Sequence, residues 1–223
     1  RDDIDPAYVA EHASFYAPNV WPNDEMRATW REYQAAVNEL DDHLLTAFAL
    51  ALEIAPDYFI QRTRRAIHTV RAINYERRAG SPPPEKHQMR MGAHTDYGVL
   101  TVLLADDVPG LQVRADGAWR DVAVPEGSLI VNIGDMLATW TNDRWSSTLH
   151  RVLPPPASTD GAVRRRSVAA FLEADPDVLI EPIPTCVSAD NPARYAPVTA
   201  GDYLMAKLLG PRELRKSEVP PRP

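Results

Sequence analysis

Apolar residues near the start of the chain recur at spacings of three, four and seven residues, which predicts one buried helical face. The helix should begin after Asn23, a good N-cap followed by Asp24 and Glu25, and should end before Pro56. A second short helix is expected over residues 57–63. The recurring apolar positions are Met26, Trp30, Tyr33, Val37, Leu40, Leu44, Phe48 and Leu52. We interpret this stripe as packing.

From residue 66 onward the pattern changes to short β-branched runs separated by turn signals. The expected strands are 67–75, 90–94, 100–104, 110–114, 119–122, 129–133, 148–153, 165–172 and 178–182. Eight or nine short strands at this spacing favour a sandwich or barrel over a parallel sheet with crossover helices. A last helix is expected over 200–209, capped by Thr199 and stopped by Gly210-Pro211, and the tail after Glu218 should be loose.

The sequence shows no repeat and no inter-domain linker, so we expect its 223 residues to form one domain. Residues 1–65 would be helical support, 66–185 the β core, and 186–223 a C-terminal helix and tail. The fold class is mainly β with flanking α-helices, with the long N-terminal helix packed on the sheets. The 44% apolar and 25% charged residues are ordinary for a globular domain.

Charge and cysteine content narrow the possible partners and compartments. The formal charge of −7 argues against nucleic acid as the main partner, because phosphate binding requires clustered Lys and Arg. No apolar run is long enough to span a bilayer, and no signal peptide is visible. The single cysteine, Cys186, is expected to be a buried apolar residue and fits a reducing cytoplasm.

The candidate chemistry begins with His94-x-Asp96 at the end of an expected strand. Strand alternation puts residues i and i+2 on the same side, so both side chains can point into one cavity. His150 lies in another expected strand, where Thr148 and Val152 share its face. Two histidines and one carboxylate on one side of a barrel form the facial triad of non-haem iron(II) oxygenases. Taken singly, the His-x-Asp pair often arises by chance, and His150 could be a core histidine.

Arg165 and Ser167 supply a second element of the candidate site. On the expected strand they share one face with Ala169 and Phe171. An inward-facing arginine is costly to bury unless it meets an anion. A guanidinium beside a hydroxyl makes a good clamp for a carboxylate. The alternative is a salt bridge from Arg165 to a core Asp or Glu.

The set His94-x-Asp96, His150 and Arg165-x-Ser167 resembles the isopenicillin N synthase-like branch of the iron(II)/2-oxoglutarate oxygenases. The resemblance spans about residues 71–209 and extends to Gly110-Leu111-Gln112-Val113, Val131-Asn132-Ile133-Gly134-Asp135 and Thr141-Asn142-Asp143-Arg144. It implies a double-stranded β-helix, or jelly-roll barrel, for residues 66–185. It also implies that an N-terminal region of the relatives is missing from this chain.

The resemblance implies an enzyme, an Fe(II)/2-oxoglutarate-dependent dioxygenase that hydroxylates, desaturates or cyclises a small organic metabolite. Its oxidation would consume O2 and be coupled to decarboxylation of 2-oxoglutarate to succinate. The expected partner is therefore a small-molecule substrate, with no nucleic acid and no membrane. The identity of the substrate and the oligomeric state stay open.

The resemblance also assigns residues to roles. The iron ligands would be His94, Asp96 and His150. The residues that hold the distal carboxylate of 2-oxoglutarate would be Arg165, Ser167 and Tyr75. Glu76 stands where the family commonly has proline after that tyrosine. The residues expected near the substrate, each of which could equally be ordinary packing, are Tyr97, Leu111, Trp140 and Phe171.

Three other kinds of protein fit the same residues. A related iron oxidase that does not use 2-oxoglutarate would keep the same motifs, and succinate formation would separate the two. A non-catalytic jelly-roll binding module would keep the fold, and the iron content of a His150→Ala variant would test it. A cupin-like zinc or manganese isomerase or lyase would use the three ligands but leave Arg165 and Ser167 without a role.

Overall fold

The computed structural model describes residues 4–155 and 162–218, with the backbone alone for residues 210–218. The chain forms two compact units. The helical unit gathers the segments Arg1–Ile67, Thr139–Arg144 and Leu172–Pro223. The sheet unit gathers the segments His68–Ala138 and Trp145–Phe171.

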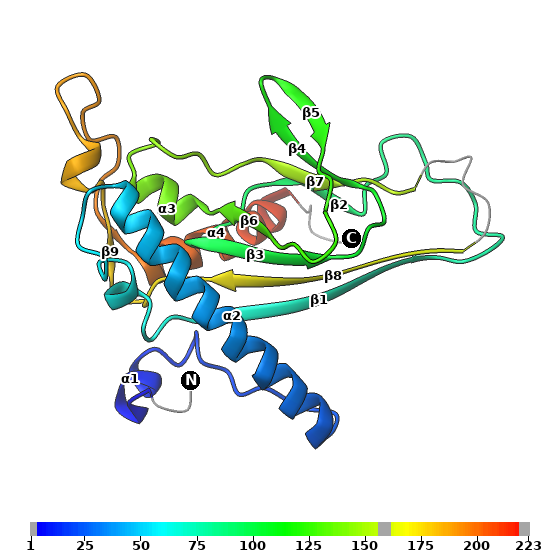
Figure 1. Ribbon diagram of the computed structural model, residues 1–223, viewed down its shortest axis with the longest axis horizontal. Coiled ribbons are helices and arrows are strands. Elements are labelled where there is room, and N and C mark those ends of the chain that lie inside the picture. The colour runs from blue at the N-terminus through cyan, green and yellow to red at the C-terminus, as the bar shows by residue number, and fades with distance from the viewer. Residues whose placement is uncertain (1–3, 156–161, 219–223) are drawn as a thin grey trace. The chain divides into compact units, whose positions relative to one another are not determined.

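Two four-stranded sheets make up the sheet unit. The first has the order β1-β8-β3-β6, with bounds His68–Arg77, Val163–Leu172, Leu100–Ala105 and Ile130–Ile133. The second has the order β2-β7-β4-β5, with bounds Met91–His94, His150–Val152, Leu111–Ala115 and Ala118–Asp121. Strands distant in sequence lie side by side, as Figure 1 shows for β1, β8 and β3. Neighbours of this kind are typical of a jelly roll.

The mainly β fold class is confirmed, and each of the nine expected strands is present with ends that differ by at most two residues. The hydrogen-bonded strands of the described residues form separate sheets rather than one closed barrel. The last expected strand, β9 (Leu179–Ile180), is not part of the β core. It lies in the helical unit and pairs with β10 (Val198–Thr199), which is too short to be recognised from its sequence.

The long helix α2 (Asp24–Ala51) follows the sequence closely. Its N-cap is Asn23, whose side chain accepts a hydrogen bond from the Met26 backbone N–H at 2.8 Å. The buried face differs from the predicted stripe by about one position in its C-terminal half. In that half the most buried side chains are Val37, Asp41, Leu45 and Ala49. At the N-terminal end of the helix, Met26 was also predicted to be buried but is 46% exposed.

The helical elements differ more from expectation than the strands do. The segment expected to be helical over 57–63 contains a 3₁₀ turn at Ile60–Arg62, and a second 3₁₀ turn covers Pro184–Cys186. Two six-residue helices were not expected, α1 (Pro6–Glu11) and α3 (Asp135–Trp140). Helices this short carry too little hydrophobic periodicity to be recognised.

The last helix, α4 (Ala200–Glu218), begins where predicted, and Thr199 Oγ1 accepts from the Asp202 backbone N–H at 3.1 Å. Its predicted end at Gly210-Pro211 is wrong. A proline removes one hydrogen bond, but its φ is helical, so it does not by itself end a helix. The tail predicted to be loose, residues 219–223, lies outside the described residues.

Two further expectations concern single features. Cys186 is buried, as predicted, with 6% of its surface exposed. Among the helices in the described part of the chain, none combines the length and apolar character required to cross a bilayer.

Candidate metal centre

A cavity of about 420 Å³ lies inside the sheet unit, lined by side chains from both of its sheets. This volume is within the range of small-molecule sites, roughly 300–1,000 Å³. Eight of the candidate site residues line it together: Tyr75, His94, Asp96, Leu111, His150, Arg165, Ser167 and Phe171. Most of the remaining wall is aliphatic, so the polar groups in it are few and specific.

Three potential metal ligands converge in this cavity. His94 Nε2 lies 4.0 Å from Asp96 Oδ1, and His150 Nε2 lies 3.7 Å from the same oxygen. The ligand atoms of all three lie within 4.8 Å of one another, and the two imidazole centroids are 4.2 Å apart. Atoms bonded to one ion at about 2.1 Å lie roughly 3 to 4 Å from each other. The three side chains are therefore close to metal-binding separations.

The backbone determines which nitrogen of each histidine is available. His94 Nδ1 lies 2.8 Å from the Gly92 carbonyl oxygen, and His150 Nδ1 lies 3.0 Å from the Thr148 carbonyl oxygen. An Nδ1–H that donates to a carbonyl leaves the Nε2 lone pair free for a metal. Each carbonyl belongs to the residue two positions earlier, so local chain geometry orients both rings.

Asp96 is oriented by two side chains from neighbouring strands. Its Oδ2 accepts from Thr101 Oγ1 at 2.8 Å and from Asn132 Nδ2 at 2.7 Å. Thr101 on β3 and Asn132 on β6 are direct partners in the sheet register. These two contacts leave Oδ1, the oxygen nearest both histidines, available to bind a metal. The carboxylate is 6% exposed, and these two hydrogen bonds offset part of the cost of burying it.

Strand alternation does not place Asp96, because β2 ends at His94. Instead the Asp96 carbonyl oxygen accepts from the Asp135 backbone N–H at 2.8 Å. Next to it, Gly134 must be glycine, since a Cβ there would lie 2.0 Å from the Gly98 carbonyl oxygen. The close approach of these two backbone segments therefore fixes the loop that carries the carboxylate.

Arg165 and Ser167 lie on β8. Arg165 is 2% exposed, and its Nη1 donates to Ser167 Oγ at 3.4 Å, while its Nε is buried without a hydrogen-bond partner. Burial lowers the pKa of Arg165, while Asp106 and Tyr75 act to raise it. No carboxylate of the described residues forms an ion pair with Arg165. An unmet donor on a buried cation favours an anion-binding site over the core salt bridge.

Tyr75, on β1 beside β8, lines the same cavity. Burial raises the pKa of its hydroxyl, against the lowering effects of Arg165, Arg90 and Arg71. The hydroxyl therefore keeps its proton at neutral pH and can donate to a carboxylate.

The four residues expected near a substrate do not lie together. Leu111 and Phe171 line the cavity, whereas Tyr97 is half-buried outside its lining. Trp140 belongs to the helical unit, where it is fully buried, packs on Phe59 at a centroid distance of 5.3 Å and donates to the Leu179 carbonyl oxygen.

Thr101 and Asn132 were not predicted to belong to the site, although both orient Asp96. The signal was a single polar residue within an otherwise apolar strand, since Thr101 stands among Leu100, Val102 and Leu103. Such a residue has no reason to face a core unless it has a partner there.

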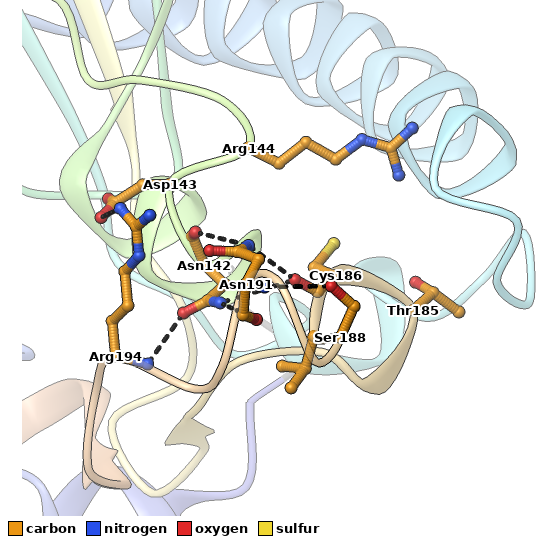
Figure 2. A pocket seen from close by; sticks show the side chains of 9 residues that line it. Asn142, Asp143, Arg144, Thr185, Cys186, Ser188, Asn191 and Arg194 are labelled. Atoms are coloured by element: carbon orange, nitrogen blue, oxygen red, sulfur yellow. Dashed lines mark hydrogen bonds and ion pairs between the residues drawn. The ribbon is translucent and has the colours of Figure 1, made fainter.

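A second hollow, of about 350 Å³, lies in the helical unit, and Figure 2 shows the side chains around it. Asn142 is 1% exposed and donates to the carbonyl oxygens of Asn191 at 3.2 Å and Pro192 at 3.1 Å. Its Oδ1 accepts from the Arg194 backbone N–H at 3.0 Å. Asn142 and Asp143 have φ of 51° and 62°, which Asn and Asp tolerate better than most residues. Because these groups satisfy one another, we interpret this hollow as a braced turn.

Comparisons of sequence give one consistent result. A family model described as the 2OG-Fe(II) oxygenase superfamily matches residues 65–174. A 2-oxoglutarate-Fe(II) type oxidoreductase, hxnY, of Emericella nidulans is 35% identical over 194 residues, which cover 84% of this chain and 54% of the relative. The chain therefore spans about half the length of the curated relatives it matches.

Comparisons of structure agree. A protein of the 2OG-Fe(II) oxygenase family from Caulobacter crescentus is 35% identical with a TM-score of 0.75, and the match covers 95% of this chain and 67% of that one. A full-length protein of Neurospora crassa, solved in complex with alpha-KG, is 30% identical with a TM-score of 0.77, covering 86% and 61% of the two chains. Sequence and fold thus point to the same group of proteins.

Proposed function

The chain belongs to the 2OG-Fe(II) oxygenase superfamily, and on that premise we propose that it is an iron(II)- and 2-oxoglutarate-dependent dioxygenase of a small organic metabolite. The observation that carries this proposal is the convergence of three ligand atoms within 4.8 Å in a cavity that also holds a buried arginine with an unmet donor. Two imidazoles and one carboxylate suit iron(II) and leave positions open for other ligands.

In this proposal His94, Asp96 and His150 hold the iron. The two histidines present Nε2 because Nδ1 of each faces a backbone carbonyl. Asp96 presents Oδ1 because Thr101 and Asn132 occupy Oδ2. Iron(II), when bound, supplies oxygen activation coupled to the decarboxylation of 2-oxoglutarate to succinate. The chain contributes a fixed arrangement of donors before any ligand arrives, which reduces the reorganisation needed on binding.

Arg165, Ser167 and Tyr75, called the clamp from here on, hold the distal carboxylate of 2-oxoglutarate. The guanidinium supplies charge and directed N–H donors, and the two hydroxyls supply neutral donors. This carboxylate would meet the buried Nε of Arg165 that has no partner in the protein. Aliphatic residues of the cavity wall, such as Leu103, Val113 and Ile130, exclude water from the reacting centre.

We place the organic substrate against the apolar wall that includes Leu111 and Phe171. A partly apolar metabolite suits this wall. Tyr97 and Trp140 are left out, because neither lines the cavity. The cytoplasm remains our proposal for the compartment, on the ground that Cys186 is a buried, unpaired cysteine.

Iron content tests the metal half of the proposal. Wild-type protein loaded with iron(II) without oxygen and then desalted should retain about one iron per chain, whereas His150→Ala should retain little, since a lost ligand weakens a site strongly. The matched control is His43→Ala, an exposed histidine on α2 that belongs to no group of three potential metal ligands among the described residues. Equal iron in wild type and His150→Ala would contradict the metal assignment.

Succinate formation tests the cosubstrate half. Iron-loaded wild type should convert 2-oxoglutarate to succinate in air, slowly without the organic substrate, and His150→Ala should not. Iron retention with neither succinate formation nor 2-oxoglutarate binding would favour the related oxidase that does not use 2-oxoglutarate.

A further inference from the structure

Arg90 carries the largest unmet hydrogen-bonding capacity beside the clamp. It immediately precedes β2, and both of its terminal nitrogens, Nη1 and Nη2, are buried without a hydrogen-bond partner. Its guanidinium carbon lies 5.6 Å from the centroid of the Tyr75 ring, which lines the cavity. A cation–π contact stabilises the charge by only about 0.5–2 kcal/mol and satisfies no N–H donor. Burying the terminal nitrogens of Arg90 therefore costs free energy that this contact does not offset.

The charged groups that act on Arg90 are few. Burial lowers the pKa of Arg90, the Arg165 guanidinium lowers it further, and Tyr75 and Asp106 raise it. Asp106, at the end of β3, also acts on Arg165. Its Oδ1 is buried without a partner, while its Oδ2 accepts from the Arg166 backbone N–H at 2.5 Å. The Arg166 side chain, 4.0 Å from Asp106, is 71% exposed and largely screened by solvent.

The charges around the clamp show what Arg90 adds. Arg71 also lines the cavity and acts on Tyr75, so Arg71, Arg165 and Asp106 together sum to +1. Arg90 raises this sum to +2, which strengthens the attraction of the cavity for a carboxylate. Its burial keeps this charge effective, because buried charges are screened less than exposed ones.

We propose that Arg90 is a positioning residue that raises the net positive charge around the clamp and thereby increases the affinity of the cavity for the distal carboxylate of 2-oxoglutarate. The inference rests on the proposed function. Arg90 does not itself line the cavity, so it acts through its field and through the Tyr75 ring that it faces. The kind of ligand it selects is a dicarboxylate that reaches from the metal to the clamp.

The test is calorimetric binding of 2-oxoglutarate to the full chain loaded with Mn²⁺, an inert substitute for iron, at low salt. Arg90→Met should raise the dissociation constant roughly 10- to 100-fold, as expected for loss of one nearby buried charge. In succinate formation with iron, the same variant should raise KM for 2-oxoglutarate and leave kcat within about twofold. Arg114→Met is the matched control, since this exposed arginine lies 5.7 Å from the Trp119 ring centroid but not beside the clamp.

A second variant separates charge from packing. In Arg90→Met/Asp106→Asn the sum of charges returns to its wild-type value, so the affinity for 2-oxoglutarate should recover to within about threefold of wild type. An Arg90 that served only to hold Tyr75 would not be rescued in this way. The inference is overturned if Arg90→Met binds 2-oxoglutarate as wild type does, or if the double variant binds no better than Arg90→Met. Failure of wild type itself to bind 2-oxoglutarate would instead overturn the proposed function.

Discussion

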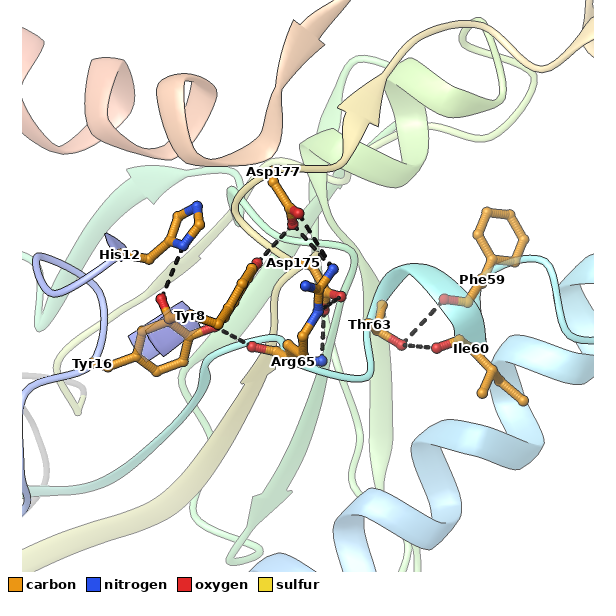
Figure 3. Close-up of polar contacts among 9 residues, drawn as sticks. All are labelled: Tyr8, His12, Tyr16, Phe59, Ile60, Thr63, Arg65, Asp175 and Asp177. Atoms are coloured by element: carbon orange, nitrogen blue, oxygen red, sulfur yellow. Dashed lines mark hydrogen bonds and ion pairs between the residues drawn. The ribbon is translucent and has the colours of Figure 1, made fainter. Parts of the chain in front are cut away.

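Two polar clusters, one around Arg65 and one around Arg165, have opposite hydrogen-bonding states. In the helical unit, Arg65 donates from Nε to Asp175 Oδ2 at 3.1 Å and from Nη2 to Asp177 at 3.3 Å, as Figure 3 shows. Its guanidinium also lies 4.0 Å from the centroid of the Tyr8 ring, and the Tyr8 hydroxyl donates to Asp177 at 2.6 Å. In the sheet unit, Arg165 has one donor directed to Ser167 and a buried Nε without a partner.

This difference separates a structural role from a binding role. A charge whose partners are all in the protein stabilises one arrangement of the chain, and its donors are not available to a ligand. A buried charge with unmet donors destabilises the free protein and becomes favourable only when an anion arrives. We therefore infer that the Arg65 cluster joins segments of the helical unit, whereas the clamp is built for a ligand.

The largest expected effect comes from Arg165→Met. Removing the guanidinium should weaken 2-oxoglutarate binding by at least about 100-fold, as is usual when a desolvated charged pair loses one partner. The melting temperature should stay the same or rise, because an unpartnered buried charge is removed. Calorimetry and thermal unfolding measure the two quantities. Retained binding together with a lower melting temperature would place Arg165 in the same class as Arg65.

Arg65→Met should have the reverse effect. Asp175, which is 0% exposed, would keep a buried carboxylate without its cation. The expected loss is about 2 kcal/mol, below the range for fully buried pairs because the Arg65 side chain is 40% exposed. Chemical denaturation measures this loss, and 2-oxoglutarate affinity should not change. Arg120→Met, which breaks an exposed pair with Asp116, is the control and should cost less than about 0.5 kcal/mol.

The smallest expected effect is a pH dependence within the Arg65 cluster. Burial acts to raise the pKa of Asp177, but the Tyr8 hydrogen bond and the Arg65 charge outweigh it and hold this pKa below its ordinary value. A lowered folded-state pKa means that the unfolded chain takes up the proton first. The stabilisation is therefore present above about pH 4–5 and is lost as the pH falls further.

The free energies of unfolding of wild type and Asp177→Asn, compared at several pH values, isolate this contribution. The difference should be about 0.5 kcal/mol at pH 7, since Asp177 is 45% exposed, and should approach zero near pH 3. A difference that grew on acidification would mean that burial, not pairing, dominates at Asp177.

The two regions were not equally predictable from the sequence. Arg165 and Ser167 were predicted to share a strand face, and both line the cavity because alternation along β8 is regular. The Arg65 cluster was not predicted, since Arg65 and Asp175 are 110 residues apart and neither belongs to a recognisable motif. The ends of helices also differed in how well the sequence predicted them. The start of α2 was predicted correctly because the N-cap at Asn23 is a local contact. The end of α4 was not, because a proline alone does not determine whether the helix continues past Pro211.

The sequence by itself determined the residue types of the candidate site, the positions of the nine expected strands and the alternation that turns His150, Arg165 and Ser167 to one side. These follow from backbone geometry over a few residues. The tertiary structure alone decided that Thr101 and Asn132 orient Asp96, that a glycine contact fixes the Asp96 loop, and that Arg90 lies against Tyr75. Each depends on contacts between segments far apart in the chain, which no local pattern encodes.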